Sequence, residues 1–316
     1  MRKDIRITHY ALRISSMQKL VECIPNFSEG RRQEVIDHVA AAARGVAGVR
    51  LLDVSSNPDH NRTVLTFVGP PEAVADAAFA STAEAVRLIN MEEHTGEHPR
   101  IGAMDVVPFV PLTGMTMDEA VQLANQTGKR IADELRVPVY LYSAAATTPA
   151  RKRLPDVRQG QYEGLKESIS TPERKPDYGE PKMHPTAGAT AVGARPPLIA
   201  FNVNLGTTNL AIAKSIGKAL RESSGGLMNV QAMGVDLAAQ GMVQVSMNLL
   251  DYTKTPIHRA YEMVRVEAER YGVPVVGSEI VGLVPLDALV GAADFYLRLT
   301  DFSRSQVLEA RLLEEG

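Results

Sequence analysis

Residues 51–72, LLDVSSNPDHNRTVLTFVGPPE, contain two strand patterns, the turn between them and the beginning of a helix. Val49–Val54 and Thr63–Val68 are rich in apolar and β-branched residues, and the SSNPDHN cluster between them has the composition of a turn. A helix over 70–89 follows, because the two prolines at its start are tolerated in a first helical turn. Two strands followed by a helix form the centre of a βαββαβ unit.

The flanking segments complete this unit. A strand is predicted at Leu20–Ile24, a helix at Arg31–Arg44, and a further strand at Asp105–Val110. Pro108 suggests that this last strand lies at a sheet edge or carries a bulge, because proline lacks the amide that a ladder needs. A helix at 116–135 and a strand at 137–142 add one more unit. The order is the split-βαβ, ferredoxin-like pattern with an addition.

The same order returns in the second half of the chain. Strands are predicted at Leu198–Leu205, Leu227–Gly234, Gln244–Leu249 and Val275–Ile280, with helices at Thr207–Ser223, at Thr255–Tyr271 and from Pro285. The predicted fold class is therefore α+β, with two ferredoxin-like (βαββαβ-type) α/β sandwich subdomains. Each sheet has one face without helices, so we expect the subdomains to pack against each other with a ligand cleft between them.

The predicted domains are an N-terminal extension at 1–18, a first subdomain at 19–197 and a second at 198–316. Met17 shortly precedes the first strand, so we interpret it as the natural start, or the extension as a dispensable arm. Residues 144–197 are rich in Pro, Gly and charge and show no clear elements, which is typical of a functional loop or a linker. This segment lacks both phosphate-loop signatures, so no nucleotide site is expected there.

Composition narrows the class of partner. The net charge of −3, the aromatic content of 5% and the lack of Trp argue against nucleic-acid binding. No run approaches the roughly 18 apolar residues that cross a bilayer, so no membrane association is expected. Cys23 is the single cysteine, which excludes an intrachain disulfide and a cysteine-cluster zinc site. Its alternating apolar surroundings indicate a buried strand thiol rather than a nucleophile.

Residues 92–109, EEHTGEHPRIGAMDVVPF, hold the strongest candidate for chemistry. His94 and His98 have the spacing of a zinc-binding helix, but the glutamate is misplaced and Gly96 and Pro99 oppose a helix, so no metal is expected. His94 is interpreted as a solvated residue at a helix end. His98 is followed by the rigid Pro99 and then by a strand, which can hold the ring in one pose, and an imidazole that titrates near neutral pH suits general acid/base catalysis. A crowded charged loop without catalytic function is the alternative.

Other polar residues are candidates for substrate binding. Arg62 and Arg100 each precede a strand, where a guanidinium could clamp a carboxylate in bidentate fashion. Asn61 lies beside Arg62 in the turn, and turn hydrogen bonding alone also explains that cluster. The asparagines of the second half lie among apolar strand residues and could face a cleft or water. The candidate substrate-binding residues are Asn61, Arg62, Arg100, Asp105, Asn204 and Asn248.

Several motifs together resemble the formiminotransferase domain of the glutamate formimidoyltransferase family. They are LVECIPNFSEGR, the stretch at 51–72, HTGEHPRIGAMDVVPFVP, VPVYLY, LIAFNVNLGT, QVSMNLLDY and PVVGSEIVGLVPLDAL. The resemblance runs from about Leu20 to Leu289. It implies two ferredoxin-like-type subdomains with a cleft, and a homodimer. It also implies transfer of the formimidoyl group from N-formimidoyl-L-glutamate to N5 of tetrahydrofolate, a step of histidine degradation.

The resemblance further implies the residues of the site. The catalytic histidine of the family lies in the GEHPR motif, which corresponds to His98. Tetrahydrofolate is the co-substrate, no metal is required, and the cyclodeaminase activity that accompanies the domain in animals is expected to be absent. The folate-contacting loop implies Gly179, Glu180, Pro181, Lys182, Met183, His184, Pro185, Thr186, Ala187 and Gly188.

A cytoplasmic one-carbon group transferase is therefore the leading hypothesis, and two alternatives stay open. The same fold could use another one-carbon donor, such as 5-formyltetrahydrofolate. The protein could also be a non-catalytic regulator that binds a folate or an amino acid, because duplicated ferredoxin-like domains often only sense ligands.

Overall fold

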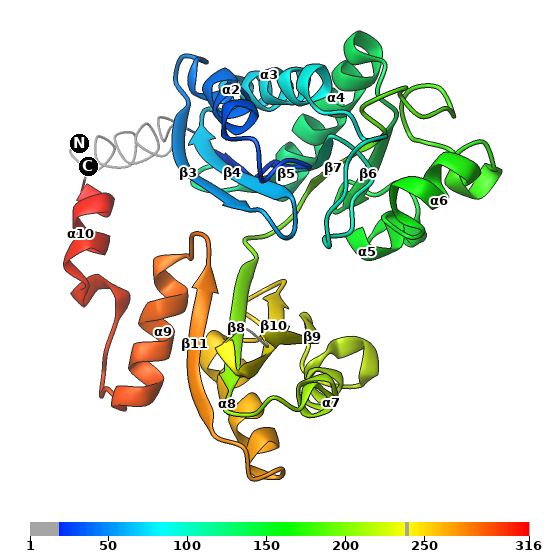
Figure 1. Ribbon diagram of the computed structural model, residues 1–316. Coiled ribbons are helices and arrows are strands. Elements are labelled where there is room, and N and C mark those ends of the chain that lie inside the picture. Colours follow the sequence, from blue (N-terminus) through cyan, green and yellow to red (C-terminus); the bar gives the residue numbers. More distant parts are fainter. Residues whose placement is uncertain (1–18, 238–239, 316) are drawn as a thin grey trace, which may run out of the picture. The chain divides into compact units, whose positions relative to one another are not determined.

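The computed structural model describes residues 19–237 and 240–315, which form two compact units (Figure 1). Unit 1 ends at Arg195 and unit 2 begins at Pro196. The cleft expected between the two units stays a prediction. The N-terminal extension and the start proposed at Met17 lie outside the described residues. No helix in the described part of the chain is long and apolar enough to cross a bilayer.

Unit 1 is a mixed sheet with helices. Within residues 19–195 its seven strands are β1 (Val21–Cys23), β2 (Asn26–Phe27), β3 (Arg50–Asn57), β4 (Arg62–Gly69), β5 (Met104–Pro111), β6 (Val139–Ser143) and β7 (Thr190–Ala194). Its helices are α2 (Gln33–Arg44), α3 (Pro71–Leu88), α4 (Met117–Leu135), α5 (Leu154–Val157) and α6 (Gln161–Ser168), with 3-10 turns at Pro149–Arg151 and Pro172–Arg174.

The strands lie in the order β3, β4, then β1 and β2 in succession, β5, β7 and β6. β1 and β2 run antiparallel to both neighbours, whereas β5, β7 and β6 run parallel. Helices α2, α3 and α4 lie along one face of the sheet (Figure 1). Leu65 and Phe67 of β4 belong to the buried core. Successive side chains of a strand point to opposite faces, so Arg62 lies on the face of β4 opposite to Leu65 and Phe67.

Local sequence explains the helix ends. Pro71 occupies the first turn of α3, as predicted from the Pro-Pro pair. The Thr116 side chain accepts from the Glu119 amide while Glu119 binds back to Thr116, which is a complete capping box at the start of α4. Arg136 ends that helix in the left-handed conformation. The predicted helices at 70–89 and 116–135 are therefore confirmed.

The structure corrects one expectation about strands in full and another in part. Residues 144–197 are not free of regular structure, because they contain α5, α6 and β7. β7 reads TAVGA, a short run of mostly small residues between Gly188 and the two prolines at 196–197, so local pattern does not distinguish it from a loop. It pairs on both sides in parallel, and its side chains are buried, as is typical of parallel strands.

Pro108 does not mark a sheet edge, because β5 is an interior strand between β1 and β7. The Pro108 carbonyl still accepts a hydrogen bond from the Ile24 amide at 3.2 Å, in the break between β1 and β2. The irregularity in β5 lies instead at Asp105. Asn26 pairs with Val106 and Phe27 pairs with Met104, so Asp105 has no partner residue on β2. Such a bulge changes the direction in which the side chain of the extra residue points.

Unit 2 is an antiparallel sheet with strands in the order β11, β8, β10, β9. The strands are β8 (Ile199–Leu205), β9 (Val230–Leu237), β10 (Met242–Leu249) and β11 (Val275–Val281). The helices are α7 (Leu210–Leu220), α8 (Ile257–Glu269), α9 (Leu286–Leu297) and α10 (Leu308–Glu315), with 3-10 turns at Glu222–Ser224 and Arg304–Gln306. Phe201 and Val203 are buried in the core of this unit, where α7 and α8 cover the sheet. The predicted order of strands and helices in this half is confirmed.

Candidate functional site

His98 lies in unit 1, on the segment that connects α3 to β5, and its side chain is half-buried. Two close backbone approaches hold this segment. A Cβ on Gly96 would meet the His60 carbonyl oxygen at 2.4 Å, and a Cβ on Gly102 would meet the Ala189 carbonyl oxygen at 2.0 Å, so both positions require glycine. The segment is therefore packed against the turn before β4 and against the residue before β7. The imidazole projects from a chain that is held at both sides.

Arg62 is the residue that fixes the His98 ring. Its Nη1 lies 2.8 Å from His98 Nδ1 and donates to Asp105 Oδ2 at 3.0 Å. Its Nε and Nη2 donate to the Asn26 side-chain oxygen at 3.1 and 2.5 Å. Because each of these nitrogens has a partner and only 13% of the side chain is exposed, Arg62 is held in one pose. The backbone oxygen of Pro99 lies 2.7 Å from the same ring nitrogen.

Asp105 shares the partner Arg62 with His98 and is fully buried. Its Oδ1 accepts from the Ile101 amide at 2.9 Å, and its Oδ2 accepts from both Arg62 and Arg158. Burial alone would raise the pKa of Asp105, but Arg158 and Arg62 together hold the pKa of this carboxyl below its ordinary value. A side chain with no exposed surface is suited to holding the two arginines rather than to touching a substrate.

Arg158 completes the cluster, and the sequence-based interpretation missed it. It follows the last residue of α5, in the segment that was expected to lack regular structure, and 11% of its side chain is exposed. Its Nη2 donates to Asp105 Oδ2. Its Nε is buried without a hydrogen-bond partner among the described residues. Asn26 was also missed, since the LVECIPNFSEGR motif was used only for the family resemblance and no role was assigned to this residue. No local signal distinguishes either residue from the other polar residues of its segment.

The cluster places two guanidinium groups and one carboxylate beside the imidazole. Burial lowers the pKa of His98, and the positive charges of Arg62 and Arg158 lower it further, to about 3. Asp105 acts in the opposite direction but is outweighed. The imidazole is therefore neutral at neutral pH. The expectation that His98 titrates near pH 7 is therefore wrong, because its pKa is lowered.

His94 is not a solvated residue at a helix end, so that interpretation is wrong. α3 ends at Leu88, and His94 lies in the following turn with a half-buried side chain. Its Nε2 lies 3.0 Å from the Asn61 carbonyl oxygen, and its Nδ1 accepts from Arg100 Nε at 3.3 Å. These tertiary contacts replace the solvation that the local sequence suggested. His94 and His98 therefore have separate surroundings.

The remaining candidates of unit 1 are occupied by internal contacts. Arg100 is buried and both of its terminal nitrogens bind Glu163, at 2.9 and 2.7 Å. Asn61 is buried with φ 48°, its side-chain oxygen accepts from the Gly30 amide at 2.9 Å, and its amide donates to the Thr95 carbonyl at 2.9 Å. These bonds fix the turn beside the site. They leave Arg158 as the arginine of the cluster with the fewest partners.

The loop Gly179–Gly188 lies at the same end of unit 1 as the His98 segment. Gly188 forms a bridge with Gly102, and the Ala103 amide donates to the Ala187 carbonyl at 2.8 Å. The Met91 amide donates to the Thr186 carbonyl at 2.7 Å. Met183, Ala187 and Gly188 are buried, whereas residues 179–182 and 185–186 are exposed. The loop thus has a fixed end near the site and an exposed part that a ligand could reach.

Asn204 and Asn248 belong to unit 2, on the sheet face away from its helices. The Asn204 side-chain oxygen accepts from Gln244 Nε2 at 2.8 Å, and the same nitrogen donates to Glu279 Oε1 at 2.9 Å. Asn248 lies on the same face of β10 as Gln244 by strand alternation. Their relation to His98 stays a prediction.

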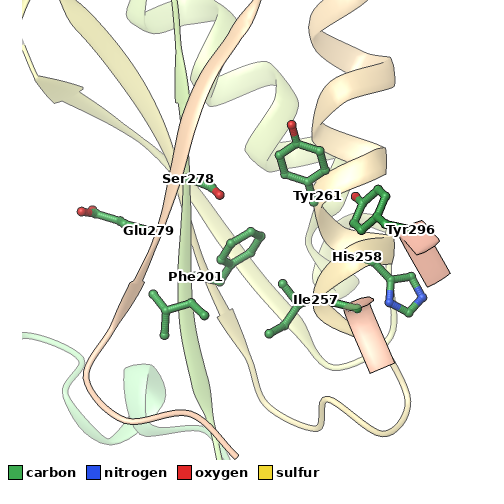
Figure 2. Close-up of a pocket in the computed structure, with 9 residues that line it drawn as sticks. Phe201, Ile257, His258, Tyr261, Ser278, Glu279 and Tyr296 are labelled. Atoms are coloured by element: carbon green, nitrogen blue, oxygen red, sulfur yellow. The ribbon is translucent and has the colours of Figure 1, made fainter. Parts of the chain in front are cut away.

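Unit 2 also contains a pocket of about 530 Å³ on the helix-covered side of its sheet (Figure 2). Phe201 comes from the sheet, Ile257 and Tyr261 from α8, and Tyr296 from α9. Glu279 points to the other side of β11 in Figure 2, in agreement with its bond to Gln244. The lining is mostly apolar and aromatic, and it lacks the charged cluster that surrounds His98.

Comparison with known proteins gives consistent matches over nearly the whole chain. Family models for the formiminotransferase domain match twice, the N-terminal subdomain over residues 20–195 and the formiminotransferase domain over residues 200–313. The glutamate formimidoyltransferase of Streptococcus pyogenes serotype M1 is 49% identical over 298 residues, which are 94% of this chain and 100% of that protein. The one from Thermoplasma acidophilum is 50% identical over 295 residues, which are 93% of this chain and 97% of that protein.

A longer protein matches as well. The formimidoyltransferase-cyclodeaminase of Rattus norvegicus is 50% identical over 286 residues, which are 89% of this chain and 53% of that protein. The present chain is thus similar to about half of the rat protein and to nearly all of the two microbial proteins.

Proposed function

This chain belongs to the formiminotransferase family, and we propose that it is a glutamate formimidoyltransferase with His98 as its general acid and base. The reaction moves the formimidoyl group from N-formimidoyl-L-glutamate to N5 of tetrahydrofolate. The observation that carries the site assignment is the half-buried, neutral His98 held by Arg62, which also binds the buried Asp105. The two microbial relatives, at 49% and 50% identity over almost their full length, support the activity.

The chemistry requires one proton to move between two nitrogens. N5 of tetrahydrofolate attacks the formimidoyl carbon, forming a carbon–nitrogen bond and a tetrahedral intermediate. The bond from that carbon to the glutamate nitrogen then breaks. The proton lost by N5 must reach the departing nitrogen, so that 5-formimidoyltetrahydrofolate and glutamate leave as products. A single group that takes up this proton and then releases it serves both steps.

The environment of His98 suits such a relay. In one neutral tautomer Nδ1 accepts from Arg62, and in the other it donates to the Pro99 carbonyl. Nε2 is a proton donor in the first tautomer and a proton acceptor in the second. Because positive neighbours destabilise the imidazolium, a proton taken from N5 is released readily to the leaving nitrogen. Holding both substrates together supplies the entropic part of the rate.

We assign the folate to the loop Gly179–Gly188. Its buried end is hydrogen-bonded to the segment that carries His98, so a pterin against the loop would lie near the imidazole. The exposed Lys182 of this loop could pair with the glutamate tail of the folate.

We place the enzyme in the cytoplasm, where its folate co-substrate is produced and used, and where a lone buried thiol such as Cys23 needs no disulfide partner.

We further propose a homodimer that covers the apolar surface of unit 2. Large apolar side chains are exposed along α9 and beside it, which is unusual for a surface that faces water. A second copy of the chain would remove this area from solvent, and sedimentation at micromolar concentration tests it. The exposed residues are Leu283, Leu286, Leu289, Phe295, Tyr296, Leu297, Leu299 and Leu308.

The assay that tests the function compares donors and variants. Turnover of N-formimidoyl-L-glutamate with tetrahydrofolate is expected, and His98→Ala should lower kcat by about 10²- to 10⁴-fold while folate binding persists. His38→Ala, an exposed histidine on α2, is the matched control and should match the wild type. Near wild-type turnover in the His98 variant would remove this residue from the mechanism. Turnover only with 5-formyltetrahydrofolate, or binding without turnover, would instead support one of the two alternatives.

A further inference from the structure

We propose that Arg158 binds the α-carboxylate of the glutamate moiety, the carboxylate next to the nitrogen that leaves. This assignment rests on the proposed transferase activity. It concerns a residue of the long segment at 144–197 for which the motifs of the chain gave no function. It follows from the hydrogen-bonding state of the arginines around His98 and from the geometry of the substrate.

Arg158 has hydrogen-bond donors that no described residue uses. Arg62 uses its Nε and both terminal nitrogens, and Arg100 binds Glu163 with both of its terminal nitrogens. Arg158 donates only through Nη2, to Asp105, among the described residues. Its Nε is buried without a partner, which is a costly state for a charged group. A guanidinium that is fixed at one nitrogen and unpaired at others is prepared for a second, incoming carboxylate.

The cluster formed by Arg62, Asp105 and Arg158 has a net positive charge. Asp105 is one negative group shared by two positive ones, Arg62 and Arg158, through the same oxygen Oδ2. Buried charge is expensive unless it is balanced, so the cluster favours one additional anion. The side chain of Arg158 retains 11% exposure, so the guanidinium is not sealed from the outside. Carboxylates are the negative groups that both substrates of the proposed reaction carry.

The position of the leaving nitrogen selects the α-carboxylate over the γ-carboxylate. The leaving nitrogen must come within hydrogen-bond reach of His98, roughly 2.6–3.2 Å, to receive a proton. That nitrogen is bonded to the α-carbon, so the α-carboxylate lies only two bonds from it, whereas the γ-carboxylate lies at the end of a flexible side chain. Arg158 is joined to His98 through Asp105 and Arg62. A carboxylate that pairs with Arg158 therefore places the leaving nitrogen close to the ring.

Binding there would also change the proton relay. The positive charge of Arg158 is one of the groups that keep His98 neutral, together with Arg62, and Asp105 opposes them. A carboxylate on Arg158 offsets that charge and makes the imidazole a stronger base at the moment when N5 must lose its proton. Recognition of the amino-acid donor and activation of the base are thus linked through one guanidinium.

The test pairs enzyme variants with donor analogues. Arg158→Gln should raise KM for N-formimidoyl-L-glutamate by roughly 10²-fold, because it leaves one partner of a charged pair unmatched, and should leave KM for tetrahydrofolate unchanged. N-formimidoyl-4-aminobutyrate lacks the α-carboxylate, so the KM for this donor should be similar in the wild type and the variant. Arg153→Gln is the control on the same segment, since 57% of that side chain is exposed. Equal losses with both donors, or a selective rise in KM for tetrahydrofolate, would overturn the assignment.

A binding measurement separates this inference from the activity itself. Calorimetry should detect L-glutamate binding to the wild type, loss of it in Arg158→Gln, and partial retention in Arg158→Lys, which keeps the charge but not the planar fork. Thermal melting verifies that each variant is folded. Failure of the wild type to turn over the donor would refute the proposed function. Glutamate binding of equal strength in wild type and both variants, or none in the wild type, would refute the role of Arg158.

Discussion

Replacement of Asp105 by Asn is a stringent test of the charge cluster, because it changes one buried charge and almost no volume. The carboxylate is fully buried and accepts three hydrogen bonds, from Arg62, Arg158 and the Ile101 amide. The amide that replaces it has one acceptor oxygen, and its NH2 group would meet donors. Two guanidinium groups would then remain together without a counter-ion.

The expected loss is large. Removing one partner of a buried ion pair costs about 3–5 kcal/mol, a large part of the roughly 5–15 kcal/mol that holds a domain folded. For a unit the size of residues 19–195 this corresponds to a fall in Tm of roughly 6–20 °C. Asp133→Asn is the matched control, because that carboxylate is 58% exposed and pairs with Lys129 on the surface of α4. The control should lie within about 0.5 kcal/mol of the wild type.

The assay must report on unit 1 alone, so we would follow amide hydrogen exchange in β5 and β7, with β10 as the reference in unit 2. The pKa of Asp105 is lowered in the folded protein, so its contribution is present above its ordinary pKa of 3.8 and is lost as the pH falls through the folded value. Wild type and variant should therefore converge in acid. Protection of β5 in Asp105→Asn within 1 kcal/mol of wild type at pH 7 would refute the ion-cluster account.

Two further predictions concern His98 and the glycines. The pKa of His98, lowered to about 3, means that its ring NMR signals should not titrate between pH 8 and 5; a transition near pH 6.5 would contradict this. Since the unfolded chain protonates first, stability should fall as the pH falls below about 6.5, and His98→Ala should reduce that slope. Gly102→Ala should disrupt the site, because the new Cβ would lie 2.0 Å from the Ala189 carbonyl oxygen. Gly164→Ala lies inside α6 with open space around it and should stabilise the protein by about 0.5–1 kcal/mol. Equal changes in Tm for the two variants would refute the packing argument.

Local patterns were sufficient for most elements of the fold. Alternating apolar residues located β4, and the prolines at 70–71 located the start of α3, because these signals depend on neighbours in the chain. The burial of Cys23 in β1 followed from the same alternation and is confirmed. The same reasoning failed at 144–197, where β7 is a strand only because β5 and β6 flank it.

The candidate site also depends partly on local sequence and partly on tertiary structure. Pattern and family resemblance in the GEHPR motif selected His98 as the catalytic candidate, because Pro99 and the strand that follows are visible in the local sequence. The low pKa of that histidine and the contact of Arg158 with Asp105 required the tertiary structure. Both depend on charges at 62, 105 and 158, which are far apart in the chain and meet only when the sheet forms. Electrostatic interaction depends on distance in space, so no local sequence pattern contains it.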